Sequence, residues 1–158
     1  MGSQLEHLAE AIRRIERQLL VRHRQNAASQ RLETIPGVGV ITATALAASV
    51  PDPTTFRSGR QFAAWLGLVP RQNSSGGKDR LGRVSKMGNG DLRRLPIVGA
   101  TSVTRRADTS QTRTAAWVRS LLERKPHRLV TVAIANKTAR TAWALLATAE
   151  THRAAPAA

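Results

Sequence analysis

An apolar repeat near the start of the chain fixes the local structure there. Apolar side chains recur at alternating steps of three and four residues, which is the spacing of a coiled-coil seam; its members are Leu5, Leu8, Ile12, Ile15 and Leu19. Charged residues occupy many of the positions between them, so the pattern predicts one helix from Gln4 to about Gln30. The seam either joins copies of the chain into a homo-oligomer or packs on the chain's own domain. Arg22 at the next seam position limits the seam to about two and a half heptads.

The composition of the remaining chain also favours helices. Alanine is abundant, whereas the aromatic residues that favour strands are scarce, with three Trp, two Phe and no Tyr in 158 residues. We therefore expect an all-α protein of about six helices. Its parts are a coiled-coil helix over residues 1–31, a compact helical domain over 32–150, and a frayed tail over 151–158.

Capping residues and prolines indicate where the later helices begin and end. The expected helices run from the turn after Ile35 to Val50, from Phe56 to Leu66 with Ser58 as N-cap, from Asn89 to Arg106 with Pro96 inside, from Asp108 or Thr109 to Lys125, and from Pro126 to about Glu150. The apolar pattern predicts that two of these helices have clear inward faces. These faces are Phe62, Trp65 and Leu66 in one, and Leu129, Val132, Ala133, Ala139, Trp143 and Leu146 in the last.

The charge of the chain is strongly positive and unevenly distributed. Lys and Arg number 25 against 10 Asp and Glu, a net charge of +15. Residues 1–56 carry six basic and five acidic groups, whereas residues 57–94 carry nine and two, and residues 95–158 carry ten and three. Such an imbalance favours a polyanionic partner, and the predominance of Arg suits bidentate contacts to phosphate. We expect the partner to be DNA; the alternative is an Arg-rich surface that is merely solvated.

Other partners and cofactors find little support in the sequence. The chain has no cysteine, no apolar run of the roughly 18 residues that a membrane span needs, and no signal peptide at its start, so we expect a cytoplasmic protein without a membrane partner. Its ten acidic residues are scattered, and its four histidines, His7, His23, His127 and His152, lack ligand spacing. We therefore expect no metal site and no cofactor in this chain.

The turn Pro36-Gly37-Val38-Gly39 precedes an Ala-rich helix and is typical of a helix–hairpin–helix element. Its glycines permit backbone angles closed to other residues, and the helix that follows begins with amide groups that have no acceptor within the helix. Together with the positive end of the helix dipole, the amides of Gly37, Val38 and Gly39 would bind a DNA phosphate. The alternative is a tight turn between helices that binds nothing.

Residues 67–90 form the least regular stretch, "GLVPRQNSSGGKDRLGRVSKMGNG", which we expect to be a long basic loop. Loops of this length are usually functional or disordered. Its cations are candidate phosphate contacts: Arg71, Lys78, Arg80, Arg83 and Lys86. Ser74 or Ser75 could attack a phosphodiester if a base or a metal activated it. The alternative is turn chemistry, for which Ser and Gly are common residues.

A second Gly-rich turn, Lys86-Met87-Gly88-Asn89-Gly90-Asp91-Leu92-Arg93-Arg94, leads into a helix with basic flanks. Lys86, Asn89 and Arg93 would form a second phosphate contact, or Asn89 would simply cap the helix. The sequence leaves these two interpretations open.

The stretch "IPGVGVITATALAASVPDPTTFRSGRQFAAWLGLVPRQNSSGGKDRLGRVSKMGNGDLRRL" resembles the C-terminal transposase domain of a large family of bacterial insertion-sequence transposases. "VAIANKTARTAWALL" resembles the final helix of that domain, and the helix before Ile35 resembles its connecting coiled coil. The similarity covers nearly the whole chain. One departure is Pro96, which lies where the family usually continues an apolar helix.

The resemblance implies a role in insertion-sequence transposition. Members of the family join this domain to a RuvC-like nuclease domain that binds Mg²⁺ through an acidic tetrad, and they use a guide RNA to pair donor and target DNA. The domain supplies a serine that attacks DNA, which by motif match is Ser75 in preference to Ser74. We expect these 158 residues to lack the RuvC-like half, and we therefore expect the chain alone to bind nucleic acid without cutting it. The alternatives are a non-catalytic helix–hairpin–helix binding module and a structural oligomerisation domain.

Overall fold

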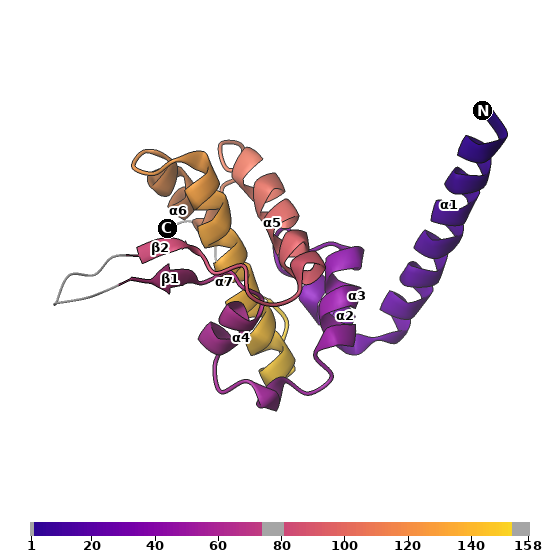
Figure 1. The fold of residues 1–158 in the computed structure, drawn as a ribbon, viewed down its shortest axis with the longest axis horizontal. Coiled ribbons are helices and arrows are strands. Elements are labelled where there is room, and N and C mark those ends of the chain that lie inside the picture. Colours follow the sequence, from indigo (N-terminus) through magenta and orange to yellow (C-terminus); the bar gives the residue numbers. More distant parts are fainter. Residues whose placement is uncertain (1, 74–80, 153–158) are drawn as a thin grey trace.

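The computed structural model describes residues 2–73 and 81–152, and it confirms the expectation of a helical protein (Figure 1). In chain order the elements are α1 (Gly2–Gln25), α2 (Ala27–Glu33), α3 (Val40–Ser49), the 3₁₀ turn η1 (Pro53–Thr55), α4 (Gly59–Trp65), β1 (Pro70–Gln72), β2 (Leu81–Val84), α5 (Gly90–Arg105), α6 (Arg113–Leu122) and α7 (His127–Thr148). None of the helices among these residues is both long and apolar enough to cross a membrane.

Helix α7 lies at the centre of the helical body and contacts α2, α4, α5, α6 and η1 (Figure 1). Small and branched side chains on its buried positions, including Val130, Ile134, Ala135 and Ala139, allow these neighbours to approach on several sides. Phe62 of α4 is the largest fully buried side chain of the core. The apolar area that these helices bury against α7 is the main stabilising contribution to the body.

The expected helix from Gln4 to Gln30 is wrong, because the structure divides it into α1 and α2 at Asn26. Asn26 has extended backbone angles, and its side-chain oxygen accepts a hydrogen bond from the Ser29 amide at 2.9 Å. This is N-cap geometry, in which the side chain satisfies an amide that a new helix would leave without an acceptor. The apolar seam ends before Asn26, and the chain turns at this cap.

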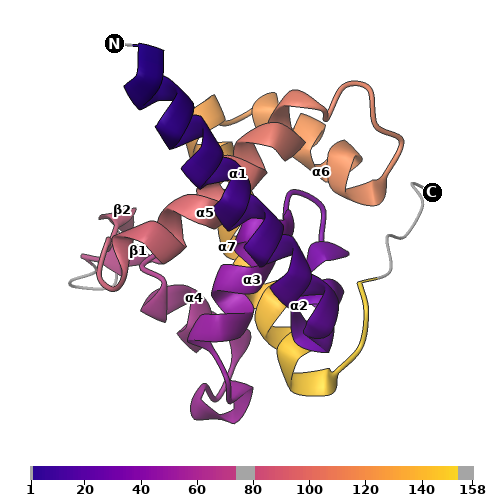
Figure 2. The same ribbon diagram turned by 90° about the vertical axis from the view of Figure 1, so that its right-hand side faces the viewer.

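Helix α1 projects away from the body, and its apolar seam is exposed (Figures 1 and 2). Leu5 and Leu8 are 72% and 61% exposed, and Ile12 and Ile15 are 51% and 53% exposed. Contacts of α1 with the body involve α2 and α3. The alternative in which this part of the seam packs on the chain's own domain is therefore wrong.

The expected irregular loop over 67–90 is also corrected, because it contains a small antiparallel sheet. Strand β1 pairs with β2, with Pro70 opposite Val84 and Gln72 opposite Leu81, and the register shifts between them. Figure 1 shows this hairpin extending from one side of the body, away from α1. The two short strands carry little alternation of apolar residues, which explains why the sequence pattern did not reveal them.

Three local predictions differ from the structure. Helix α6 begins after Thr112, whose hydroxyl accepts from the Ala115 amide, and not after Asp108 or Thr109. Trp65 was predicted to face inward but is 38% exposed. It stacks on Phe62 at 5.7 Å between ring centroids, and the rest of its indole is in solvent. Leu129 is 54% exposed in the first turn of α7. By contrast, Ser58 caps α4 as predicted.

Candidate nucleic-acid interface

The turn between α2 and α3 owes one of its glycines to packing inside the protein. Gly37 has φ of +84°, and a Cβ added there would lie 2.7 Å from the carbonyl oxygen of Gly99 on α5. Both the left-handed backbone and the close approach of α5 require glycine. The absence of a side chain at Gly37 therefore makes room for α5, whereas the sequence suggested room for a phosphate.

Gly39 differs, because nothing lies within 4 Å of the position where its Cβ would be. It is the N-cap of α3, it is exposed, and no side chain caps the helix there. The first helical bond of α3 runs from the Ala43 amide to the Gly39 carbonyl at 2.9 Å. The amides before Ala43 thus have no acceptor within the helix, and the positive end of its dipole adds to their attraction for an anion.

Val38 cannot offer its amide in this conformation. The Val38 N–H donates to the Ile35 carbonyl at 3.0 Å, and the side chain of Val38 is buried. The phosphate site predicted at Gly37, Val38 and Gly39 is therefore reduced to the N-terminus of α3, where Gly39 leaves open space.

The second Gly-rich turn is a well-capped helix start. The Asn89 side-chain oxygen accepts from the amides of Asp91 and Leu92 at 2.9 and 3.2 Å. A Cβ on Gly88, which has φ of +93°, would collide with the Trp65 carbonyl oxygen. Arg93 is half-buried, with Nη1 at 3.5 Å from the Met87 carbonyl. Asn89, Gly88 and Arg93 thus hold this turn in place, and Lys86 remains exposed at its start.

The hairpin carries two of the predicted cations and is anchored to the core. Arg71 and Arg83 are both exposed, and the Arg71 guanidinium donates to the Ser85 carbonyl at 3.3 Å. Asn136 of α7 donates to the Leu68 carbonyl at 3.2 Å, just before β1. The remaining predicted residues of this stretch lie outside the described residues; they are Ser74, Ser75, Lys78 and Arg80.

Helix α5 connects the two candidate phosphate sites. Its first turn carries Asn89 and Arg93, and Gly99 lies against the turn that precedes α3. At 1.5 Å rise per residue, Asn89 and Gly99 are about 15 Å apart along the helix. The fold therefore places the open N-terminus of α3 and the base of the hairpin along one helix, at separate points.

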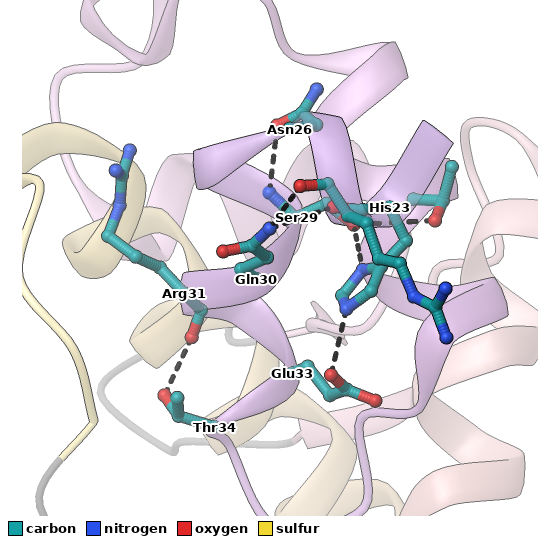
Figure 3. Close-up of polar contacts among 9 residues, drawn as sticks. His23, Asn26, Ser29, Gln30, Arg31, Glu33 and Thr34 are labelled. Carbon is teal, nitrogen blue, oxygen red and sulfur yellow. Dashed lines mark hydrogen bonds and ion pairs between the residues drawn. The ribbon is translucent and has the colours of Figure 1, made fainter. Parts of the chain in front are cut away.

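A buried polar cluster that the sequence did not reveal joins α1, α2 and α3 (Figure 3). His23 Nδ1 lies 2.8 Å from Ser29 Oγ, and His23 Nε2 lies 2.8 Å from Glu33 Oε2. Ser29 Oγ is also 3.3 Å from Thr44 Oγ1. The order serine, histidine, carboxylate is that of a hydrolase triad, but Ser29 is completely buried and no substrate can reach it. The cluster is structural.

Most of the positive charge has no acidic partner within the described parts of the chain. The ion pairs found there join His23 to Glu33 and Arg94 to Asp91, the second at 3.8 Å between exposed side chains.

Burial and the nearby charge of Lys137 lower the pKa of His152 below its usual value. Over residues 2–73 and 81–152 no group of three or more His, Asp or Glu side chains is placed to hold a metal ion.

The chain resembles proteins of known insertion elements. The model of the family described as "Transposase IS116/IS110/IS902 family" matches residues 29–116, a range that includes the turn before α3, the hairpin and α5. A probable family 20 transposase of Pseudomonas aeruginosa is 48% identical over 97% of this chain and 45% of its own length. The transposase for insertion sequence element IS1111A of Coxiella burnetii is 43% identical over 91% of this chain and 40% of its own length. The chain thus spans less than half the length of these relatives.

Proposed function

The chain belongs to the IS116/IS110/IS902 transposase family, and from this premise we propose that it binds DNA and carries the serine nucleophile during transposition of an insertion sequence. DNA would lie against a helix–hairpin–helix element formed by α2 and α3 and against the base of the β1–β2 hairpin. The chain covers 45% and 40% of the length of these two relatives, so the complete reaction would also use regions of the relatives outside the matched part.

The observation that carries the DNA-binding proposal is the open N-terminus of α3. Gly39 leaves free space in front of amides that no side chain caps. In a protein of net charge +15, such a helix end favours a phosphate over any other common ligand. Contacts of this kind read the DNA backbone and not the base sequence.

The serine proposal rests on the family and on the position of the segment in the sequence. In the sequence, Ser74 and Ser75 fall between β1 and β2, two paired strands whose base is anchored to α7 through Asn136. In the proposed step, Ser75 Oγ gives its proton to a base, forms a bond to the phosphorus, and the scissile P–O bond breaks to leave a strand with a free hydroxyl. We propose that the base and the Mg²⁺ come from a RuvC-like half outside this chain.

Two further partners belong to the same proposal. The exposed seam of α1 would pair with a second copy of the chain, because an apolar stripe of this kind is otherwise left in water. A guide RNA would occupy part of the basic surface, as the resemblance to RNA-guided transposases implies.

Substitution of Gly39 tests the DNA-binding proposal directly. Gly39 has φ of −97° and ψ of 178°, angles that any residue adopts. In Gly39→Asp, the carboxylate would cap α3 and retain or increase stability, while it repels a phosphate. We expect duplex affinity to fall about tenfold or more, the effect of losing one charge-assisted hydrogen bond.

The matched control is Gly39→Ala, which fits the open space without a charge and should bind DNA like the parent chain. Affinity of the parent chain should fall by a factor of about 100 or more between roughly 50 and 200 mM salt if several phosphates are contacted. Equal affinities of Gly39→Asp and Gly39→Ala, or duplex binding that does not change with salt, would contradict the proposal.

A further inference from the structure

An open groove of about 760 Å³ lies between α4, α6 and α7. One face of α7 forms most of the length of the groove, and its residues there are Ala133, Asn136, Lys137, Arg140 and Ala144. Arg60 of α4 and Trp117 of α6 complete its sides. Figure 1 shows both helices beside α7, α6 nearer its upper end and α4 nearer its lower part.

Close packing of α4 on α7 creates one wall of the groove. A Cβ added to Gly59 would lie 3.1 Å from the Arg140 Cα, so glycine allows the backbones of the two helices to approach. This contact places the exposed side chain of Arg60 on the residue that follows Gly59, beside the part of α7 that carries Arg140. Two arginines from different helices therefore border the same groove.

The groove combines aromatic and cationic side chains in one place. Trp117 and Trp143 are half-buried, whereas Arg60, Lys137 and Arg140 are exposed, so apolar surface lies deeper than the charges. Lys137 Nζ lies 4.6 Å from the centroid of the Trp117 ring, a cation–π contact that holds the ammonium group over the groove. The described residues that line the groove include three cations and no Asp or Glu.

The groove also continues toward the hairpin. Asn136 lines it and, through its side-chain amide, donates to the Leu68 carbonyl at 3.2 Å. Leu68 is two residues before β1, so one end of the groove lies beside the base of the hairpin. A ligand that leaves the hairpin along α7 would enter the groove.

We propose that this groove binds single-stranded DNA, with phosphates at Arg60, Lys137 and Arg140 and bases against the tryptophan surface. The inference rests on the proposed function in DNA transposition, and it assigns a second surface to that function. A duplex presents phosphates but hides its base faces, so it would leave the aromatic part of the groove unused. A single strand exposes both, and grooves that bind single strands combine cations with aromatic side chains in this way.

Tryptophan fluorescence offers a direct assay in the 158-residue chain. Of its three tryptophans, Trp117 and Trp143 line the groove, and Trp65 does not. In a Trp65→Phe background every remaining tryptophan therefore reports on the groove. We expect an oligothymidylate of about 20 nucleotides, longer than one typical binding site, to quench this fluorescence.

Two double variants distinguish the loss of groove arginines from a general loss of positive charge. Arg60→Ala with Arg140→Ala removes two exposed arginines of the groove, and Arg124→Ala with Arg128→Ala removes two exposed arginines outside its lining. All four positions are exposed, so thermal melting should change little. We expect the groove variant to lower affinity for the oligothymidylate about tenfold or more, and the control variant to lower it less than about threefold.

Several outcomes would overturn the inference. These are an unchanged tryptophan signal, equal losses in the two double variants, a larger loss for duplex than for single strand in the groove variant, and tighter binding of an RNA of matched sequence. If the oligothymidylate fails to bind while duplex binding persists and responds to Gly39→Asp, the groove inference is wrong and the proposed function stands. If neither nucleic acid binds, both are wrong.

Discussion

His23 Nε2 lies 2.8 Å from Glu33 Oε2, and this contact ties the end of α1 to α2 across the break at Asn26. His23 is only 6% exposed, whereas the side chain of Glu33 is 43% exposed. The other ring nitrogen of His23 meets Ser29, which also approaches Thr44 on α3. A polar contact at the last turns of α1 therefore contributes to the direction in which α1 leaves the body, and the contact lies where the apolar seam has ended.

Removal of His23 should loosen this junction. In His23→Ala, Ser29 loses a hydrogen-bond partner inside the protein and a cavity forms, so we expect a loss of about 2 kcal/mol in the free energy of unfolding. Glu33→Gln is the matched control, because it can still accept from the ring and loses only the charge. Urea denaturation measures both, and a change below about 0.5 kcal/mol in His23→Ala would contradict the role given to the cluster.

The same variant should also free the direction of α1. The chain contains no cysteine, so spin labels at two introduced cysteines, one on α1 and one on α7, report a single distance. We expect a narrow distribution in the parent chain and a broad one in His23→Ala. Equal widths would show that other contacts of α1 with α2 and α3 fix its direction.

Substitution by alanine should cost much more stability at Gly37 than at Gly39, the two glycines of the turn before α3. Gly37→Ala places a Cβ 2.7 Å from the Gly99 carbonyl oxygen in a left-handed backbone, so we expect a loss of more than about 2 kcal/mol. Gly39→Ala meets nothing within 4 Å, so we expect its loss to be limited to the roughly 0.5–1 kcal/mol by which alanine is a poorer N-cap than glycine. Chemical denaturation of both variants is the measurement, and similar losses would show that the turn has another geometry.

These glycines also show how far sequence reasoning reaches in this chain. Features set by near neighbours were predictable: Ser58 caps α4, and α3 ends before Pro51. The need for glycine at position 37 was not predictable, because it comes from the contact with Gly99 on α5, which is far along the chain. The hairpin was not predicted for a similar reason. Its strands are short, and it is anchored to the body by the hydrogen bond from Asn136 to Leu68, which are far apart in the sequence.

The exposed seam predicts self-association through α1. Leu5, Leu8, Ile12 and Ile15 are each more than half exposed, and an apolar stripe with this spacing is stabilised when it packs against a partner helix. We expect sedimentation equilibrium to give a dimer or higher oligomer for the parent chain and a monomer for Ile12→Asp. Arg17→Asp, on the opposite side of the heptad, is the control and should leave the mass unchanged. A parent chain that sediments as a monomer would rule out this role of the seam.

Covalent attack on DNA should depend on Ser75 and on a partner half. A serine hydroxyl becomes a nucleophile only when a base or a metal takes part, and we propose that both come from a RuvC-like half outside this chain. We therefore expect no adduct from the 158-residue chain alone, and a protein–DNA adduct that survives denaturant from an intact transposase that contains these residues. Ser75→Ala should abolish the adduct, and Ser74→Ala, the neighbouring hydroxyl, should retain it. The opposite result would assign the nucleophile to Ser74, and an adduct in the double variant would exclude this segment, so that the chain would act by binding DNA alone.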